Sequence, residues 1–150
     1  MKRVLVVEDS MTCAGLLEAQ LQQIFGEVEV ISSDDPQSAL LRLATDDFDL
    51  LILDLMLPGS PPSKTLEDFS AVMKRLPAVV VTGVQDVTGQ VMGRCTTELF
   101  VACMRAGADS LIPKDQLSLE FLRTAVRLAI LENRVEQLAK QAGLSIIREE

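Results

Sequence analysis

Short apolar runs alternate with longer stretches of helical periodicity along the chain. The runs are rich in Val, Ile and Leu, and they occupy five segments: Arg3–Val7, Val28–Ser32, Leu50–Leu53, Ala78–Val81 and Asp109–Ile112. The third and fourth runs show no polar alternation, as expected of strands that are covered on both faces. The pattern therefore predicts an α/β domain with a parallel sheet and right-handed crossovers.

Residues that start helices lie between the apolar runs. Ser10 can cap a helix that ends near Phe25, and Asp35 can cap a second helix whose first turn holds a proline. The segment 57–63, with three prolines, is predicted to be a loop. Three further helices are predicted, over Thr65–Leu76, over Thr97–Arg105 and from about Leu117 to Ala142.

The last predicted helix, roughly 39 Å long, is too long merely to cover this sheet. Its apolar residues follow the 3, 4, 3, 4 spacing of a coiled-coil seam: Leu128, Leu131, Val135, Leu138 and Ala142. Two interpretations stay open, a dimerising or signal-transmitting helix and an amphipathic tail packed on its own domain. We expect one domain over residues 1–131, and over 132–150 an extension of the last helix that forms a coiled coil or a linker to an absent output module.

Composition narrows the classes of function. The net charge is −8, the 14 basic residues are scattered, and aromatic residues make up 3% with no Trp or Tyr, so direct nucleic-acid binding is not expected. No apolar run reaches the roughly 18 residues that span a bilayer, so we expect no membrane insertion and a cytoplasmic location. Cys13, Cys95 and Cys103 follow no metal-ligand spacing and are expected to be small buried apolar residues.

The chain contains no histidine. This excludes a Ser-His-Asp triad, a histidine zinc site and a phosphohistidine relay within the chain.

Acidic residues follow two of the predicted strands. Glu8 and Asp9 come directly after the first, and Asp54 after the third. The carboxyl ends of parallel strands share one edge, so these groups converge if the two strands are neighbours. Carboxylates about 4 Å apart repel by on the order of 4 kcal/mol. Either one of them then holds a proton or a cation lies among them, and this all-oxygen set suits Mg²⁺.

Two further side chains suit a phosphoryl group. Thr82 ends the fourth predicted strand and offers a hydroxyl, and Lys114 follows the fifth and offers a positive charge. Alone, Thr82 is more often a turn former and Lys114 a surface charge. Found together with Asp9 and Asp54, each at the end of its own strand, they indicate a site.

Four segments resemble the motifs of two-component response-regulator receiver domains: Val4–Ser10, Asp54–Gly59, Val79–Gly83 and Ala106–Lys114. The resemblance covers about residues 2–131. It implies a flavodoxin-like, doubly wound sheet of five parallel strands in the order 2-1-3-4-5, with five helices of which the last is extended.

The resemblance also implies a mechanism. Asp54 would take a phosphoryl group from a partner histidine kinase or phosphotransfer protein, Thr82 and Lys114 would contact its oxygens, and the face of helix 4, strand 5 and helix 5 would change shape. The implied Mg²⁺ ligands are Glu8, Asp9, Asp54 and the backbone carbonyl of Met56. Such a chain is a signalling phosphoswitch that assists only its own phosphorylation and dephosphorylation, not an enzyme. The heptad spacing of the last helix, rather than the resemblance, makes a homodimer through that helix one of the expected interactions.

The long last helix departs from the family pattern, and so do two further features. Leu111 stands where the family often has an aromatic switch residue. The segment Gly83–Cys95 makes the interval from Thr82 to Lys114 longer than usual, either as a functional loop or as a tolerated insertion.

Other functions remain as alternatives. The first is a degenerate receiver that is not phosphorylated and acts as a protein-binding adaptor. A nucleotide or flavin protein would need a glycine-rich turn after the first strand, which the sequence lacks. A haloacid-type phosphohydrolase would have a second aspartate where this chain has Met56.

Overall fold

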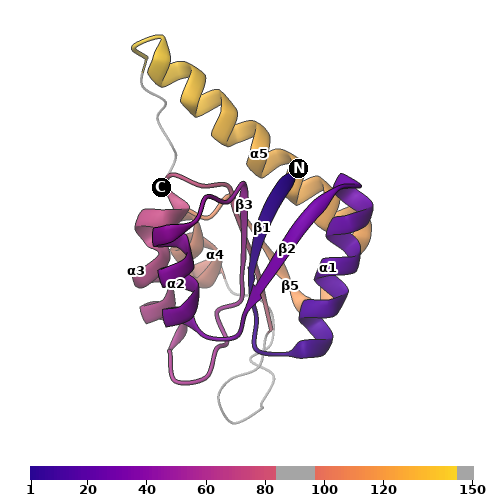
Figure 1. Ribbon diagram of the computed structural model, residues 1–150. Helices are drawn as coiled ribbons and strands as arrows, with labels where there is room; N and C mark the ends of the chain where they lie inside the picture. Colours follow the sequence, from indigo (N-terminus) through magenta and orange to yellow (C-terminus); the bar gives the residue numbers. More distant parts are fainter. Residues whose placement is uncertain (84–96, 145–150) are drawn as a thin grey trace.

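Five parallel strands alternate with five helices in the computed structural model, which describes residues 1–83 and 97–144 (Figure 1). The strands are β1 (Lys2–Val7), β2 (Val28–Ser33), β3 (Leu50–Leu53), β4 (Ala78–Thr82) and β5 (Ser110–Pro113). The helices are α1 (Met11–Phe25), α2 (Pro36–Thr45), α3 (Pro62–Met73), α4 (Thr97–Ala106) and α5 (Leu119–Gln141), with a 3₁₀ turn over Lys114–Gln116. The sheet order is β2-β1-β3-β4-β5, which confirms the predicted fold class and makes β1 and β3 neighbours.

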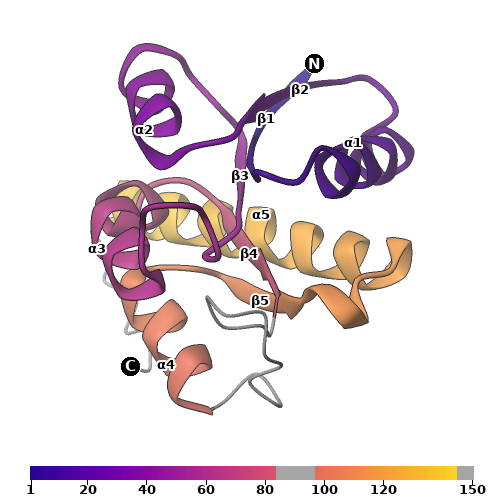
Figure 2. The same ribbon diagram turned by 90° about the horizontal axis from the view of Figure 1, so that it is seen from below.

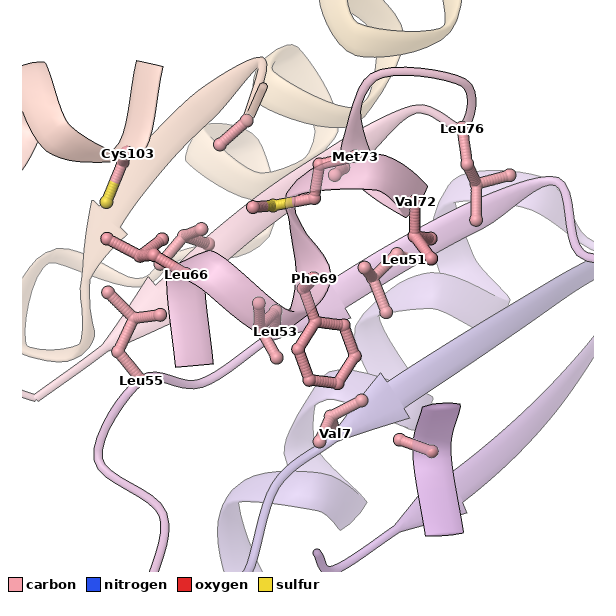
Figure 3. Packing of buried hydrophobic residues seen from close by; sticks show 14 of the residues in the cluster. Val7, Leu51, Leu53, Leu55, Leu66, Phe69, Val72, Met73, Leu76 and Cys103 are labelled. Atoms are coloured by element: carbon pink, nitrogen blue, oxygen red, sulfur yellow. The ribbon is translucent and has the colours of Figure 1, made fainter. Parts of the chain in front are cut away.

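The sheet is covered on both faces. Helices α2, α3 and α4 pack on one face, and α1 and α5 pack on the other (Figures 1 and 2). Figure 3 shows the first of these layers, where the fully buried ring of Phe69 lies against Val7, Leu51 and Leu53. Burial on two faces explains why the central strands carry uninterrupted apolar runs.

The predicted helix caps are present. Ser10 Oγ accepts a hydrogen bond of 3.2 Å from the Cys13 N–H, and Asp35 Oδ1 accepts one of 2.8 Å from the Ser38 N–H. Helix α5 begins two residues later than Leu117, because the 3₁₀ turn comes first and the Ser118 side chain then caps the helix.

Helix α3 spans Pro62–Met73, so the predicted range Thr65–Leu76 was wrong at both ends. The preceding loop ends at Pro61 because Pro62 occupies the first helical turn, where its missing N–H leaves no hydrogen bond unmade. Beyond Met73 the chain forms a turn in which the N–H groups of Arg75 and Leu76 both donate to the Val72 carbonyl, and Pro77 then disfavours helical backbone at Leu76.

Helix α5 has an inner and an outer face. Its buried residues point to the sheet, and these are Leu122, Ala125, Val126 and Ala129. The apolar residues of the predicted seam are instead exposed: Leu128 by 59%, Leu131 by 57%, Val135 by 48% and Leu138 by 58%. The alternative of a tail packed on its own domain is therefore wrong for these residues. In Figure 1 the last turns of α5 extend beyond the sheet.

The cysteines differ in burial. Cys103 is buried as predicted, but Cys13 is only half-buried, because it lies in the first turn of α1 near the edge of the sheet. Cys95 and all of the predicted insertion except Gly83 lie outside the described residues. Within the ranges 1–83 and 97–144, no helix has both the length and the apolar character that crossing a membrane requires.

Candidate functional site

The five parallel strands all end at one edge of the sheet, the lower edge in Figure 1 and the near side in Figure 2. There Glu8 and Asp9 follow β1, and Asp54 follows β3. One carboxylate oxygen from each of the three lies within 4.8 Å of the other two. Glu8 and Asp54 are buried, with 4% and 2% of their surface exposed, whereas Asp9 is exposed. The predicted convergence of the three carboxylates is therefore present.

Both oxygens of Asp54 have partners. Oδ1 accepts hydrogen bonds of 3.0 Å from the Thr82 hydroxyl and 3.0 Å from the Met56 N–H. Oδ2 lies 3.1 Å from Lys114 Nζ. The ends of β4 and β5 thus each contribute a side chain to Asp54, so the structure brings the predicted Thr82 and Lys114 to it.

Lys114 also contacts Glu8. Its Nζ lies 2.7 Å from Glu8 Oε1, which in addition accepts a hydrogen bond of 3.3 Å from the Ser10 N–H. The sequence left two ways to relieve the repulsion of the carboxylates, a proton or a cation. The structure shows a further one, an ammonium group of the chain itself between Glu8 and Asp54.

The surroundings shift the pKa values of these groups in different directions. Burial, followed by the neighbouring Asp54, raises the pKa of Glu8 to about 7, although Lys114 opposes the shift. Burial alone would raise the pKa of Asp54, but Glu8, the Met56 N–H and Lys114 together hold it below its ordinary value. Burial likewise opposes the charge of Lys114, yet the two carboxylates raise its pKa above the usual range. At neutral pH, Asp54 is therefore ionised and Glu8 is close to half protonated.

The donor set fits a hard divalent cation. The three carboxylates offer only oxygen, which Mg²⁺ prefers. Within the described part of the chain, the second oxygen of Glu8, Oε2, is buried and has no hydrogen-bond partner. A buried acceptor without a partner is unfavourable, and a metal ligated at this oxygen would satisfy it. Met56 enters the site through its N–H, and the role expected for its carbonyl stays a prediction.

Two residues of the site were missed at the sequence level. The Ser10 N–H bonds to Glu8, and the Cys13 thiol lies close enough for the charge of Glu8 to act with burial in raising its pKa. The available signal was their position, because Ser10 follows Asp9 directly and Cys13 lies in the first turn of the helix that Ser10 caps.

The chain matches the family model of the response regulator receiver domain over residues 4–127. It is 30% identical over 95 residues to the two-component response regulator ARR14 of Arabidopsis thaliana, with 63% of this chain and 23% of that protein covered. It is 27% identical over 143 residues to the response regulator MprA of Mycobacterium leprae, with 95% and 57% covered. The match thus covers about a quarter of the length of ARR14 and somewhat over half of the length of MprA.

Solved structures show the same fold. A CheY-like response regulator receiver domain protein from Methanospirillum hungatei aligns with a TM-score of 0.68 and 24% identity, over 91% of this chain and 98% of that one. NtrX from Brucella abortus aligns with a TM-score of 0.75 and 21% identity, over 99% of this chain and 31% of that one. The family model covers most of the chain, and the sheet order agrees with these folds. The chain belongs to the response regulator receiver domain family of two-component signalling.

Proposed function

We propose that Asp54 accepts a phosphoryl group from a partner histidine kinase or histidine phosphotransfer protein. The observation that carries this proposal is the setting of Asp54, whose two oxygens contact the Thr82 hydroxyl and the Lys114 ammonium group. The lowered pKa of Asp54 keeps its carboxylate ionised, and therefore nucleophilic, at neutral pH. These 150 residues contain no histidine, so the donor phosphohistidine must lie outside them.

In the proposed step an oxygen of Asp54 attacks the phosphorus of the donor phosphohistidine. A bond from this oxygen to phosphorus forms as the phosphorus–nitrogen bond breaks, and the electron pair of the broken bond stays on the imidazole nitrogen. The product is an acyl phosphate on Asp54. Lys114 and Thr82, already on the two carboxylate oxygens, would move to the phosphoryl oxygens and stabilise the charge that develops there.

The proposed Mg²⁺ ligands are Glu8, Asp9, Asp54 and the backbone carbonyl of Met56. The bound ion would neutralise charge on the carboxylates and on the incoming phosphoryl group. The partnerless Oε2 of Glu8 and the exposure of Asp9 support this assignment, since one offers a buried ligand atom and the other lies open to solvent. Glu8 would have to give up its proton on binding, because ligating carboxylates are ionised.

Movement of Thr82 would connect the site to the surface formed by α4, β5 and α5. A hydroxyl drawn from Asp54 towards a phosphoryl oxygen would favour one of two pre-existing states of the domain. Leu111 on β5 is 8% exposed and belongs to the same core cluster as Cys103 on α4, so it can follow such a change without the aromatic ring common in the family.

We further propose that residues 1–131 form the signalling domain and residues 132–150 its extension, in a cytoplasmic protein. The last buried residue of α5 is Ala129, which supports a division near this point. As a phosphoswitch the domain would assist only its own phosphorylation and dephosphorylation.

Intact-mass measurement after incubation with Mg²⁺ and acetyl phosphate tests the proposal. We expect one added phosphoryl group that hydroxylamine removes, and none on Asp54→Asn. Asp68→Asn is the matched control, because Asp68 lies on α3 in an exposed pair with Lys64 and should leave phosphorylation unchanged. Absence of the adduct from the wild-type chain, with no Mg²⁺ binding, would favour the unphosphorylated adaptor instead.

A further inference from the structure

The outer face of α5 carries a stripe that is apolar except at Thr124 and that begins seven residues before the seam predicted from the sequence. Counting back from Leu128 in steps of four and three residues reaches Thr124 and Phe121, and both are exposed. The stripe thus occupies successive a and d positions over nearly the whole helix: Phe121, Thr124, Leu128, Leu131, Val135 and Leu138.

The stripe lies on the side of α5 that faces away from the domain. At 100° per residue, the centre of the stripe lies roughly 140° around the helix from the centre of the buried face, which is formed by Leu122, Ala125, Val126 and Ala129. The contact of Asn133 agrees with this orientation, because its side-chain N–H reaches the Arg75 carbonyl on the inner side at 3.5 Å. A second helix could therefore pack along the stripe without displacing α5 from the sheet.

We propose that the occupant of this stripe is α5 of a second copy of the chain, aligned in parallel as a two-stranded coiled coil. The residue types favour two strands, since β-branched Val135 stands at an a position and Leu131 and Leu138 stand at d positions. The pairing requires no phosphorylation, so it is independent of the function proposed for Asp54.

The charged residues beside the stripe favour a parallel over an antiparallel arrangement of the two helices. Arg127 and Arg134 occupy g positions and Glu132 occupies an e position. In a parallel pair each g residue faces the e residue five positions later on the partner helix, which brings Arg127 to Glu132 on both sides. In an antiparallel pair g faces g and e faces e, so the arginines of the two chains would meet each other.

The parallel arrangement also determines how two domains would sit. With the stripes facing each other, the sheets lie on the outer sides of the helix pair, and both acidic edges point the same way. The apolar surface that is now exposed from Leu128 to Leu138 would be buried between the two copies.

Sedimentation equilibrium of the full 150-residue chain without phosphodonor tests this proposal. We expect a monomer–dimer equilibrium. Val135→Lys should weaken the dimer at least about tenfold, because it buries an unpaired charge. Gln137→Lys adds the same charge two residues away, on an exposed position outside the stripe, and should leave the dimer unchanged. Circular dichroism checks that both variants keep the wild-type fold.

A charge exchange tests the direction. Arg127→Glu should weaken the dimer, and Arg127→Glu combined with Glu132→Arg should restore it, because the exchanged pair has the same complementarity. A wild-type chain that stays monomeric over a hundredfold range of concentration, or forms trimers, would overturn the proposal. Equal effects of the changes at Val135 and Gln137 would also overturn it, as would a tighter dimer for Arg127→Glu alone.

Discussion

Lys114 Nζ lies 2.7 Å from Glu8 Oε1, although β3 and β4 separate their strands, β5 and β1, in the sheet. The lysine side chain therefore reaches from the end of β5 past Asp54 to the residue that follows β1. This contact holds positive charge among the acidic residues when no metal is bound. It does not fully compensate Glu8, whose pKa remains raised to about 7.

The first prediction concerns stability and pH. The pKa of Glu8 in the folded protein, about 7, exceeds its ordinary value of 4.5, so the fold favours the protonated form. This contribution to stability is complete below about pH 4.5 and is lost as the pH rises through 7. We expect the free energy of unfolding, measured with urea in EDTA, to fall by about 3 kcal/mol between pH 4.5 and 8.

Glu8→Gln is the control for this prediction, because it keeps the shape of the side chain and cannot ionise. The variant should show little change in stability over the same pH range. The lowered pKa of Asp54 does not interfere, since stability from a depressed carboxyl pKa is lost only at more acidic pH. An equal pH slope in the variant and the wild type would contradict the assignment to Glu8.

A second prediction concerns Mg²⁺ and Asp9. Mg²⁺ that binds only the folded chain should raise the free energy of unfolding at pH 8. The gain should be about 1.4 kcal/mol when the Mg²⁺ concentration is ten times the dissociation constant. Asp9→Asn should remove most of this gain, and its own stability should be close to that of the wild type because Asp9 is exposed. Asp68→Asn should keep the full gain. Equal stabilisation of the Asp9 variant by Mg²⁺ would remove Asp9 from the ligand set.

The third prediction separates phosphorylation from its readout. Thr82→Ala removes the hydroxyl that bonds Asp54, but leaves Asp54 and Lys114 in place. We expect the variant to gain the phosphoryl group and yet to lose the phosphorylation-dependent change in hydrogen exchange over α4, β5 and α5. Thr82→Ser retains the hydroxyl and should keep that change. A full response in Thr82→Ala would show that another residue couples the site to this face.

A fourth prediction compares two glycines. At Gly107, where φ is +110°, an added Cβ would lie 2.9 Å from Lys74 Cγ and 3.1 Å from the Lys74 nitrogen. Gly107→Ala should therefore lower the free energy of unfolding by about 1–3 kcal/mol. Gly15, inside α1, has open space around it, and Gly15→Ala should raise the same quantity by roughly 0.5–1 kcal/mol. Urea unfolding measures both, and a neutral Gly107→Ala would contradict the close approach to Lys74.

The elements that sequence predicted best are those with an unambiguous local signal. The uninterrupted apolar runs of β3 and β4 marked the central strands to within a residue, and Asp35 marked the start of α2. Helix α3 was misplaced because Pro62 can signal either a loop or a first helical turn. Only packing against the sheet decides between these two.

In the candidate site, too, the sequence predicted the positions of residues better than the contacts of their side chains. The positions of Glu8, Asp9 and Asp54 at strand ends sufficed to predict their convergence. Which of the adjacent Glu8 and Asp9 is buried could not be predicted, because both follow the strand and the chain turns there. The contact between Lys114 and Glu8 could not be predicted either, because it depends on the conformation of a side chain that extends past two intervening strands.

The length of α5 amplifies small rotations at its start into larger displacements at its end. The helix begins five residues after Lys114, and its 23 residues span about 35 Å towards and beyond the opposite edge of the sheet (Figure 1). Rotating a helix of that length by about 5° about its N-terminus displaces its C-terminus by about 3 Å. An adjustment near Lys114 too small to disturb the core would therefore become a displacement of nearly an atomic diameter at the far end of α5.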